Sequence, residues 1–235
     1  MDILRVEYAV LDEAAFLSHL EIMKAFERAI RRAQTPIAFS EGFNPHPKIA
    51  IAAPLAVGTE GKHEYLDLEL TKAINPREFI ENINKSLPLG IKVLKARMVP
   101  KTKPLMAVIN CAGYRVELDV EKVEIPALRK AVQTFMEQDS VITVRKTQKG
   151  TKEIDVRKGV FELKTAFSVL SADLDMFLIM GNEGNVRPYE VVHAIFKFMD
   201  TIADDVIMKT SRTGLFIYQN GERKSPMNFG SEALV

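Results

Sequence analysis

The chain has a single cysteine, no tryptophan and almost no net charge. Cys111 alone cannot form an intramolecular disulfide, and it cannot supply the ligands of an iron–sulfur cluster. The 32 Lys and Arg residues are balanced by 31 Asp and Glu residues. No global field therefore attracts polyanions, and a nucleic-acid site would have to come from local clustering of cations. This cysteine usage is typical of a reducing compartment, and we expect a cytoplasmic protein.

Long apolar runs and the common phosphate-binding and nucleophile motifs are also missing. No stretch approaches the roughly 18 apolar residues that a membrane span needs, and the start M-D-I-L-R-V-E-Y lacks the basic and apolar regions of an export signal. There is no Gly-rich phosphate loop, nucleophile elbow or dinucleotide fingerprint, and G-N-E-G-N at 181–185 is predicted to be a turn before a helix. We therefore expect neither export nor membrane insertion.

The apolar residues recur with helix and strand periods in two successive series. In the first half they predict a strand over 3–10, a helix over 12–33 with Asp12 as N-cap, strands over 49–53 and 64–70, a helix over 76–87 capped by Asn75, and a strand over 91–98. In the second half they predict a strand over 114–120, a helix over 126–137, strands over 141–147 and around 159–170, a helix over 188–199, and a strand over 206–218.

Each half reads β-α-β-β-α-β, with an extra strand possible in either, which is the element order of a ferredoxin-like unit. We therefore predict an α+β fold of two such units, each an antiparallel sheet with helices on one face, over residues 1–99 and 105–235. The segment P-K-T-K-P at 100–104 separates them. No repeat of individual residues is evident between the halves, so the duplication is inferred from element order.

The polar loop S-E-G-F-N-P-H-P-K, residues 40–48, is the most informative stretch. Pro45 and Pro47 fix their own φ and keep the residues before them out of the helical region. This restriction lowers the entropy cost of using Asn44, His46 and Lys48 on a ligand. The alternative is a loop that only bridges a helix and a strand.

The first helix carries a basic stripe on the side opposite its apolar positions. The stripe covers slightly more than two turns and consists of Lys24, Arg28, Arg31 and Arg32. It could meet two or three phosphates, or it could be an ordinary solvated face. His19 falls on the apolar side of the same helix, where a buried, hydrogen-bonded histidine is the simpler interpretation.

The strand around residues 63–70 combines a histidine with several acids. Alternation places Tyr65, Asp67 and Glu69 on one face and Glu64 on the other. This pattern favours a salt-bridge network, with a site that needs both charge signs as the alternative. No pairing of His19, His46 or His63 with the carboxylates has a recognised ligand spacing, so we predict no metal site.

The quoted motifs also carry a resemblance. The chain resembles the radical SAM-linked family of bacterial proteins of unknown function, through F-L-S-H-L-E from Phe16, R-A-I-R-R-A from Arg28, S-E-G-F-N-P-H-P-K from Ser40, A-P-L-A-V-G from Ala53 and E-Y-L-D-L-E-L from Glu64. The similarity is dense over about the first 70 residues and looser beyond. The family signature falls on Ser18, His19, Ser40, Gly42, Phe43, Asn44, Pro45, His46, Pro47, Glu64 and Asp67.

The resemblance implies a partner, because members of that family are fused to a radical SAM enzyme or encoded beside one, often near a ribonuclease of the E/G type and ribosomal protein genes. With one cysteine and no C-x-x-x-C-x-x-C motif, this chain would be the free-standing form and hold no cofactor itself. The partner would carry the iron–sulfur cluster and S-adenosylmethionine. One departure is Glu21, which stands where the family usually has Asp.

Three hypotheses follow. In the first, a non-catalytic subunit binds or presents RNA to the radical SAM enzyme, with a binding surface formed by Lys24, Arg28, Arg31, Arg32, Ser40, Phe43, Asn44, His46 and Lys48. In the second, the chain is an enzyme acting on a nucleotide or phosphorylated small molecule, with His46 or His19 as acid/base beside Glu64 or Asp67. In the third, it is a scaffold whose loop docks on the partner over an exposed apolar patch.

Overall fold

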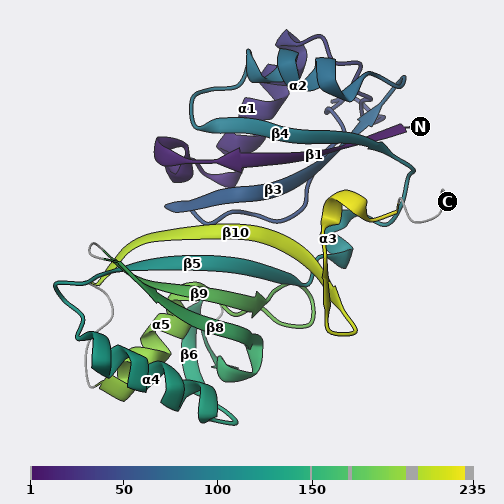
Figure 1. The fold of residues 1–235 in the computed structure, drawn as a ribbon. Helices are drawn as coiled ribbons and strands as arrows, with labels where there is room; N and C mark the ends of the chain where they lie inside the picture. The colour runs from purple at the N-terminus through teal and green to yellow at the C-terminus, as the bar shows by residue number, and fades with distance from the viewer. Residues whose placement is uncertain (1, 149, 169–170, 200–205, 231–235) are drawn as a thin grey trace. The chain divides into compact units, whose positions relative to one another are not determined.

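The computed structural model describes residues 2–148, 150–168, 171–199 and 206–230, and the chain divides into two compact units (Figure 1). The first unit comprises Met1–Ile109 together with Arg212–Val235, and the second comprises Asn110–Ser211. The predicted boundary at 99–105 lies close to Ile109, where the chain leaves the first unit and enters the second. The C-terminal residues, however, were predicted to belong to the second unit, whereas polar contacts described below attach them to the first.

The first unit is built on an antiparallel sheet in which β1 (Asp2–Val10) lies between β3 (Thr59–Leu70) and β4 (Ile91–Val99). The short strand β2 (Ile49–Ile51) pairs with the end of β3. Strand β10 (Ile207–Gln219) begins in the second unit, and from Arg212 onward it lies in the first unit next to β3, followed by its hairpin partner β11 (Glu222–Lys224).

Two helices, α1 (His19–Arg32) and α2 (Pro76–Asn84), lie on one face of this sheet (Figure 1). The apolar residues of that sheet face and of the helices form one buried cluster, which includes Leu4, Val6, Phe26, Leu66, Leu68 and Ile83. The opposite face carries the alternate residues of β1 and β3. Short helical segments lie at η1 (Asp12–Phe16), α3 (Leu105–Val108) and η4 (Pro226–Asn228).

The first helix begins later than the sequence pattern predicted. Asp12 starts a separate 3-10 turn, and Ser18 is the N-cap of α1. The Ser18 hydroxyl accepts a hydrogen bond from the Glu21 N–H at 3.3 Å, while the Glu21 carboxylate accepts from the Ser18 N–H at 2.8 Å. This capping box explains why an acid stands at position 21. Phe16 and Leu20, which fall within the predicted helix range, are largely exposed.

The second unit has the sheet order β5-β9-β8, formed by β5 (Cys111–Asp119), β9 (Ser171–Ile179) and β8 (Val160–Phe167). Its helices α4 (Ile125–Glu137) and α5 (Pro188–Phe196) pack on one face around a second buried cluster. Strands β6 (Ile142–Thr147) and β7 (Gly150–Asp155) form a separate two-stranded sheet. Short 3-10 segments follow at η2 (Arg157–Gly159) and η3 (Lys197–Met199).

Two strands of this unit were missed. Neither β7 nor β9 was predicted, and the predicted strand around 159–170 ends at Leu170, which lies outside the described residues. The α+β class with mainly antiparallel sheets is confirmed. Within the described parts of the chain, none of the helices combines the length and apolar character needed to cross a membrane.

The structure also shows a residue-level repeat that the sequence comparison of the halves missed. The tripeptide R-V-E occurs in both β1 and β5, at residues 5–7 and 115–117. Arg5 lies opposite Asp67 of β3, and Arg115 lies opposite Asp175 of β9. Each arginine makes a two-pronged ion pair with its aspartate, at 2.9 and 3.0 Å in the first unit and 2.7 and 2.8 Å in the second.

The two ion pairs differ in burial, and this difference predicts their contribution to stability. The Arg5 side chain is 1% exposed, whereas Arg115 is 40% exposed. Asp67→Asn leaves a buried guanidinium without its charged partner, so we expect the free energy of unfolding to fall by about 3–5 kcal/mol. The matched variant Asp175→Asn should cost less than about 1 kcal/mol. Denaturant unfolding measures both, and equal losses would contradict the role assigned to burial.

Candidate nucleic-acid interface

The acidic strand β3 is occupied by structural ion pairs on both faces. On the helix side, Glu64 is buried and accepts hydrogen bonds from Arg212 Nε and Nη2 at 2.8 and 2.5 Å. The same guanidinium donates to the carbonyl oxygen of Pro54 at 2.9 Å. Burial, with a smaller contribution from Glu64, raises the pKa of the neighbouring Tyr8 phenol. Glu64 therefore joins three segments of the first unit.

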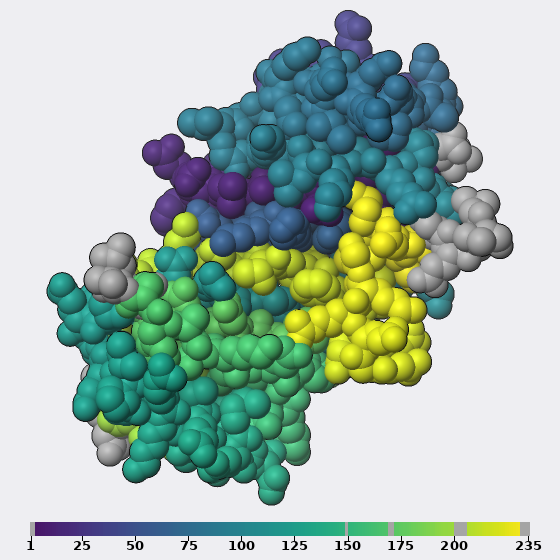
Figure 2. All heavy atoms as spheres, viewed as in Figure 1, coloured from purple at the N-terminus to yellow at the C-terminus, as the bar shows by residue number. Residues whose placement is uncertain are grey.

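Asp67 performs a similar role on the opposite face. The Arg5 guanidinium that it binds also donates to the carbonyl oxygens of Pro226 and Phe229, at 2.9 and 2.6 Å. Figure 2 shows the C-terminal residues, in yellow, lying against the purple N-terminal strand of this unit. Asp67 thus holds the cation that fixes the C-terminal segment.

Glu69 connects the same strand to the Pro-rich loop. Lys48 Nζ donates to Glu69 Oε1 at 2.9 Å, and Lys101 Nζ lies 3.6 Å from Oε2. The hydrogen bond from Lys48, followed by the charge of Lys101, lowers the pKa of the Glu69 carboxyl below its ordinary value. Lys48 was predicted to bind a ligand, and in the structure it also positions the end of its own loop.

The loop is a narrow hairpin closed at its base. The Ser40 N–H donates to the carbonyl oxygen of His46 at 2.8 Å, and the His46 N–H donates to the Ser40 hydroxyl at 2.9 Å. Gly42 has a φ of +116°, a conformation that glycine adopts readily, and allows the turn. Phe43 and Asn44 stand at the tip, where Phe43 is fully exposed.

The basic stripe and the stem of this loop meet at the end of α1. A cleft of about 270 Å³ is lined by Glu27, Ile30 and Arg31 of the helix and by Phe39 and Pro47 of the loop stem, among other residues. Lys24, Arg28 and Arg31 are exposed. Arg32 instead donates to the carbonyl oxygen of Ser86. Three of the four basic side chains are therefore directed to solvent on the face that leads to the loop.

The structure does not bring the proposed catalytic histidines to their acids. His19 is the first residue of α1 and is partly buried, while His46 is exposed in the loop. Glu64 and Asp67 are bound to Arg212 and Arg5 as described. Among the residues that the structure describes, no three His, Cys, Asp or Glu side chains are grouped to hold a metal ion.

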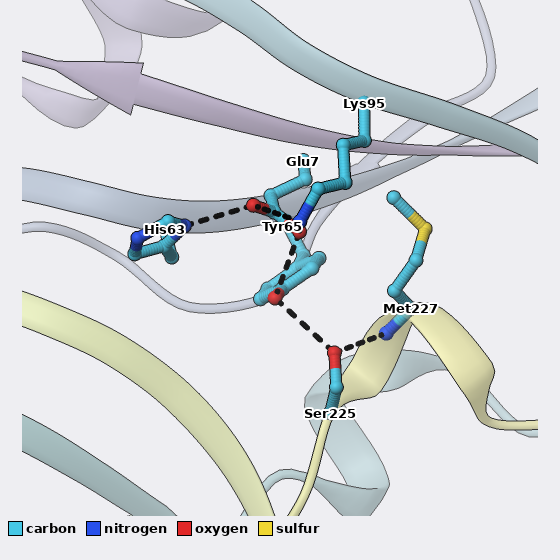
Figure 3. Close-up of polar contacts among 6 residues, drawn as sticks. All are labelled: Glu7, His63, Tyr65, Lys95, Ser225 and Met227. Carbon is cyan, nitrogen blue, oxygen red and sulfur yellow. Dashed lines mark hydrogen bonds and ion pairs between the residues drawn. The ribbon is translucent and has the colours of Figure 1, made fainter.

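Sequence reasoning missed a second polar cluster, centred on Glu7 (Figure 3). The Glu7 side chain is 3% exposed, and its Oε1 lies 2.8 Å from His63 Nδ1 and 3.4 Å from Lys95 Nζ. Tyr65 donates to Glu7 at 3.3 Å and lies 3.5 Å from the Ser225 hydroxyl. Burial is the main cause that raises the pKa of Tyr65, to about 12.

The cluster depends on strand register, which explains why it was missed. Glu7 lies directly opposite Tyr65 on β3 and Lys95 on β4. The only local signal is that Glu7 and Arg5 share the face of β1 opposite the apolar residues. Two partners of Glu7, Tyr65 and Lys95, lie 58 and 88 residues away along the chain.

The Glu69 pair predicts a pH dependence. Because the folded pKa lies below that of the unfolded chain, the pairing stabilises the fold above about pH 4.3, and this stabilisation is lost as pH falls through the folded pKa. Lys48→Met should raise the pKa of Glu69 toward its ordinary value, and the more distant Lys101→Met should raise it less. NMR titration of the Glu69 carboxyl carbon tests this order, which equal shifts would contradict.

Comparison with solved structures identifies relatives of the fold. A chain in "Crystal Structure of a Cbf5-Nop10-Gar1 Complex" is similar at 11% identity with a TM-score of 0.50, covering 88% of this chain and 48% of that chain. This chain therefore spans about half the length of that relative. "Crystal Structure of an Unknown Protein from Galdieria sulphuraria" matches at 11% identity with a TM-score of 0.26, over 85% of this chain and 91% of that one.

A comparison with curated proteins gives no match. Residues 4–188 match the family described as "Uncharacterized protein conserved in bacteria (DUF2344)". This match covers well over half of the chain, and it confirms the expected membership in a bacterial family of unknown function. The chain belongs to this family of proteins conserved in bacteria.

Proposed function

We propose that this chain is an accessory subunit that binds RNA and presents it to a radical SAM enzyme. The observation that carries the proposal is the cleft at the end of α1, where Arg31 lies beside Phe39 and Pro47 of the loop stem. RNA binding outside duplexes combines cations that follow the phosphates with aromatic side chains on which bases stack. The α1–loop surface, meaning Lys24, Arg28, Arg31, Phe39 and residues 40–48, supplies both.

The closed base of the loop adds to this argument. The two hydrogen bonds between Ser40 and His46 hold the tip in place before any ligand arrives. Preorganisation of this kind reduces the ordering cost of binding. In the proposed complex Phe43 stacks on a base, and Asn44 and His46 contact base edges or ribose hydroxyls. Arg32, held by Ser86, contributes its charge rather than a direct contact.

The partner is proposed from the sequence resemblance. The radical SAM enzyme would supply the iron–sulfur cluster and S-adenosylmethionine, and this chain would hold the RNA. The scaffold alternative expects an exposed apolar patch beneath the loop. The loop stem lines a cleft in which Arg31 and Glu27 stand among apolar residues, so its lining is not purely apolar, and the exposed cations Lys24 and Arg28 on the same helix favour RNA.

We also propose that both units are ferredoxin-like. In the first unit the order of elements is β1-α1-β2-β3-α2-β4, with β1 between β3 and β4 and with β2 on β3. In the second, β5 pairs with β9 and β9 with β8, and two helices cover one face. The repeated Arg–Asp pair on the first strand of each unit supports a common origin.

Removal of two stripe cations tests the RNA proposal. Arg28→Ala with Arg31→Ala should weaken binding to a single-stranded RNA by more than about tenfold, because each lost phosphate contact also loses its counterion release. The slope of log K against log salt should become shallower by about 1.4, or 0.7 for each contact. Fluorescence anisotropy at several salt concentrations measures both quantities.

The control is Lys122→Ala with Lys130→Ala, which removes the same charge from the second unit. We expect this variant to keep wild-type affinity and salt slope. If the arginine variant binds RNA as tightly as wild type, the α1–loop surface is not the interface and the proposal must be abandoned.

One observation favours a second candidate function, an enzyme that uses the Glu7 cluster. Glu7 binds His63 at Nδ1, which leaves Nε2 free to act as a base, and the His63 side chain is half exposed. A buried carboxylate that orients a histidine is the arrangement used in general acid–base catalysis. Lys95 beside it could hold an anionic group of a nucleotide or phosphorylated small molecule.

His63→Gln tests this candidate. General-base catalysis is worth about 10²–10⁴ in rate, so any turnover of nucleotides or sugar phosphates should fall by at least about 100-fold, as followed by mass spectrometry of the products. His46→Gln should leave that turnover unchanged. No turnover by the wild-type protein, or equal rates in the two variants, would remove the enzyme candidate.

A further inference from the structure

A second cavity lies on the other side of the loop stem, on the sheet face that the helices leave open. It has a volume of about 280 Å³, and its apolar lining includes Ile3, Ala50 and Pro104. Ile3 lies opposite Glu69 in the sheet, and Ala50 lies opposite Asp67. The segment 101–104, which follows β4, completes the lining. The cavity therefore belongs entirely to the first unit.

The polar side of the cavity carries two cations that share one acid. Lys48 and Lys101 both pair with Glu69, and the side chain of Lys101 is 63% exposed. An ammonium has three donors, so each lysine keeps N–H groups for a further acceptor. Asp67 also lines the cavity, but its charge is matched by Arg5. Asp67 and Glu69 carry two negative charges, and Arg5, Lys48 and Lys101 carry three positive charges. The net local charge is therefore +1, which favours binding of an anion.

We infer that this cavity binds one nucleotide of the presented RNA, with the base against the apolar side and the phosphate on Lys48 and Lys101. The inference rests on the proposed function. Cavities for drug-sized ligands begin at about 300 Å³, so a volume of 280 Å³ suits a ligand as small as one nucleotide. A flat base needs apolar walls, and its phosphate needs cations at the opening.

Continuity with the α1–loop surface supports a nucleotide over other small anions. Pro47 lines the cleft beside Arg31, and the next residue, Lys48, lines this cavity. Adjacent Cα atoms are only about 3.8 Å apart. An RNA strand bound along α1 would pass around the edge of the loop stem to reach the cavity, and Pro47 and Lys48 are the neighbouring points of the two sites.

Titration of the intact protein with the four nucleoside 5′-monophosphates, followed by NMR, tests the inference. We expect at least one monophosphate to shift the amide signals of residues around the cavity. Inorganic phosphate alone and the unphosphorylated nucleoside should each bind about tenfold more weakly, because each lacks half of the contacts. If phosphate alone binds equally well, the site holds an anion and no base, and the inference fails.

Two variants test whether the monophosphate binds in this cavity. Ala50→Phe fills the cavity from an exposed position without changing charge, and Lys101→Ala removes one phosphate donor; each should weaken monophosphate binding about tenfold or more. Lys130→Ala, which removes an exposed lysine of the second unit, is the matched control and should bind as wild type. Unchanged affinity in Ala50→Phe, with its fold verified by its NMR spectrum, would overturn the inference.

The outcome also separates this inference from the proposed function. If RNA binding depends on Arg28 and Arg31 but no monophosphate binds, the cavity inference fails and the RNA interface stands. A different result is that monophosphates bind, that Ala50→Phe abolishes this binding, and that RNA affinity is unchanged when Arg28 and Arg31 are replaced. In that case the cavity binds free nucleotides and the RNA proposal fails.

Discussion

The buried ion pair between Arg5 and Asp67 is the interaction on which the first unit most depends. Its guanidinium joins β1 to β3 and also holds two carbonyl oxygens of the C-terminal segment, which closes part of the open sheet face. In the second unit the corresponding pair of Arg115 and Asp175 lies near the surface. The same chemistry thus serves as an internal anchor in one unit and as a surface contact in the other.

Strand β3 also connects this anchor to the proposed binding surface. Glu64 lies on one face of the sheet, Asp67 and Glu69 lie on the other, and each of these three acids fixes a cation from a different segment. Glu64 and Asp67 bind arginines that secure the β10 and η4 segments, while Glu69 binds Lys48 at the end of the Pro-rich loop. The end of the loop is consequently attached to strand β3, and Phe43 at the tip is fully exposed. The acids of β3 therefore serve mainly to hold the fold together, and the exposed loop and helix face remain for recognition.

Much of the fold could be predicted from the sequence, because apolar periodicity and caps are local signals. The strands at Asp2–Val10 and Ile91–Val99 and the helices starting at Pro76 and Ile125 fall close to the predicted ranges. The predicted start of α1 was wrong because Asp12 resembles a cap, whereas the Ser18–Glu21 box supplies both of its hydrogen bonds. Strand β9 was missed because its acids at 173 and 175 interrupt an apolar run. The Glu7–His63 contact and the attachment of Arg212 to the first unit depend on pairing between strands that are distant in the sequence. A local sequence pattern does not predict such pairing.

The central claim is that RNA lies along α1 and the Pro-rich loop, and ultraviolet cross-linking in native cells tests it most directly. The protein would be purified under denaturing conditions after irradiation, and the cross-linked peptides would be identified by mass spectrometry. The account predicts nucleotide adducts on peptides that contain Phe39 or Phe43, and their loss when Arg28 and Arg31 are both replaced by alanine. Absence of adducts, or adducts confined to the second unit, would contradict it.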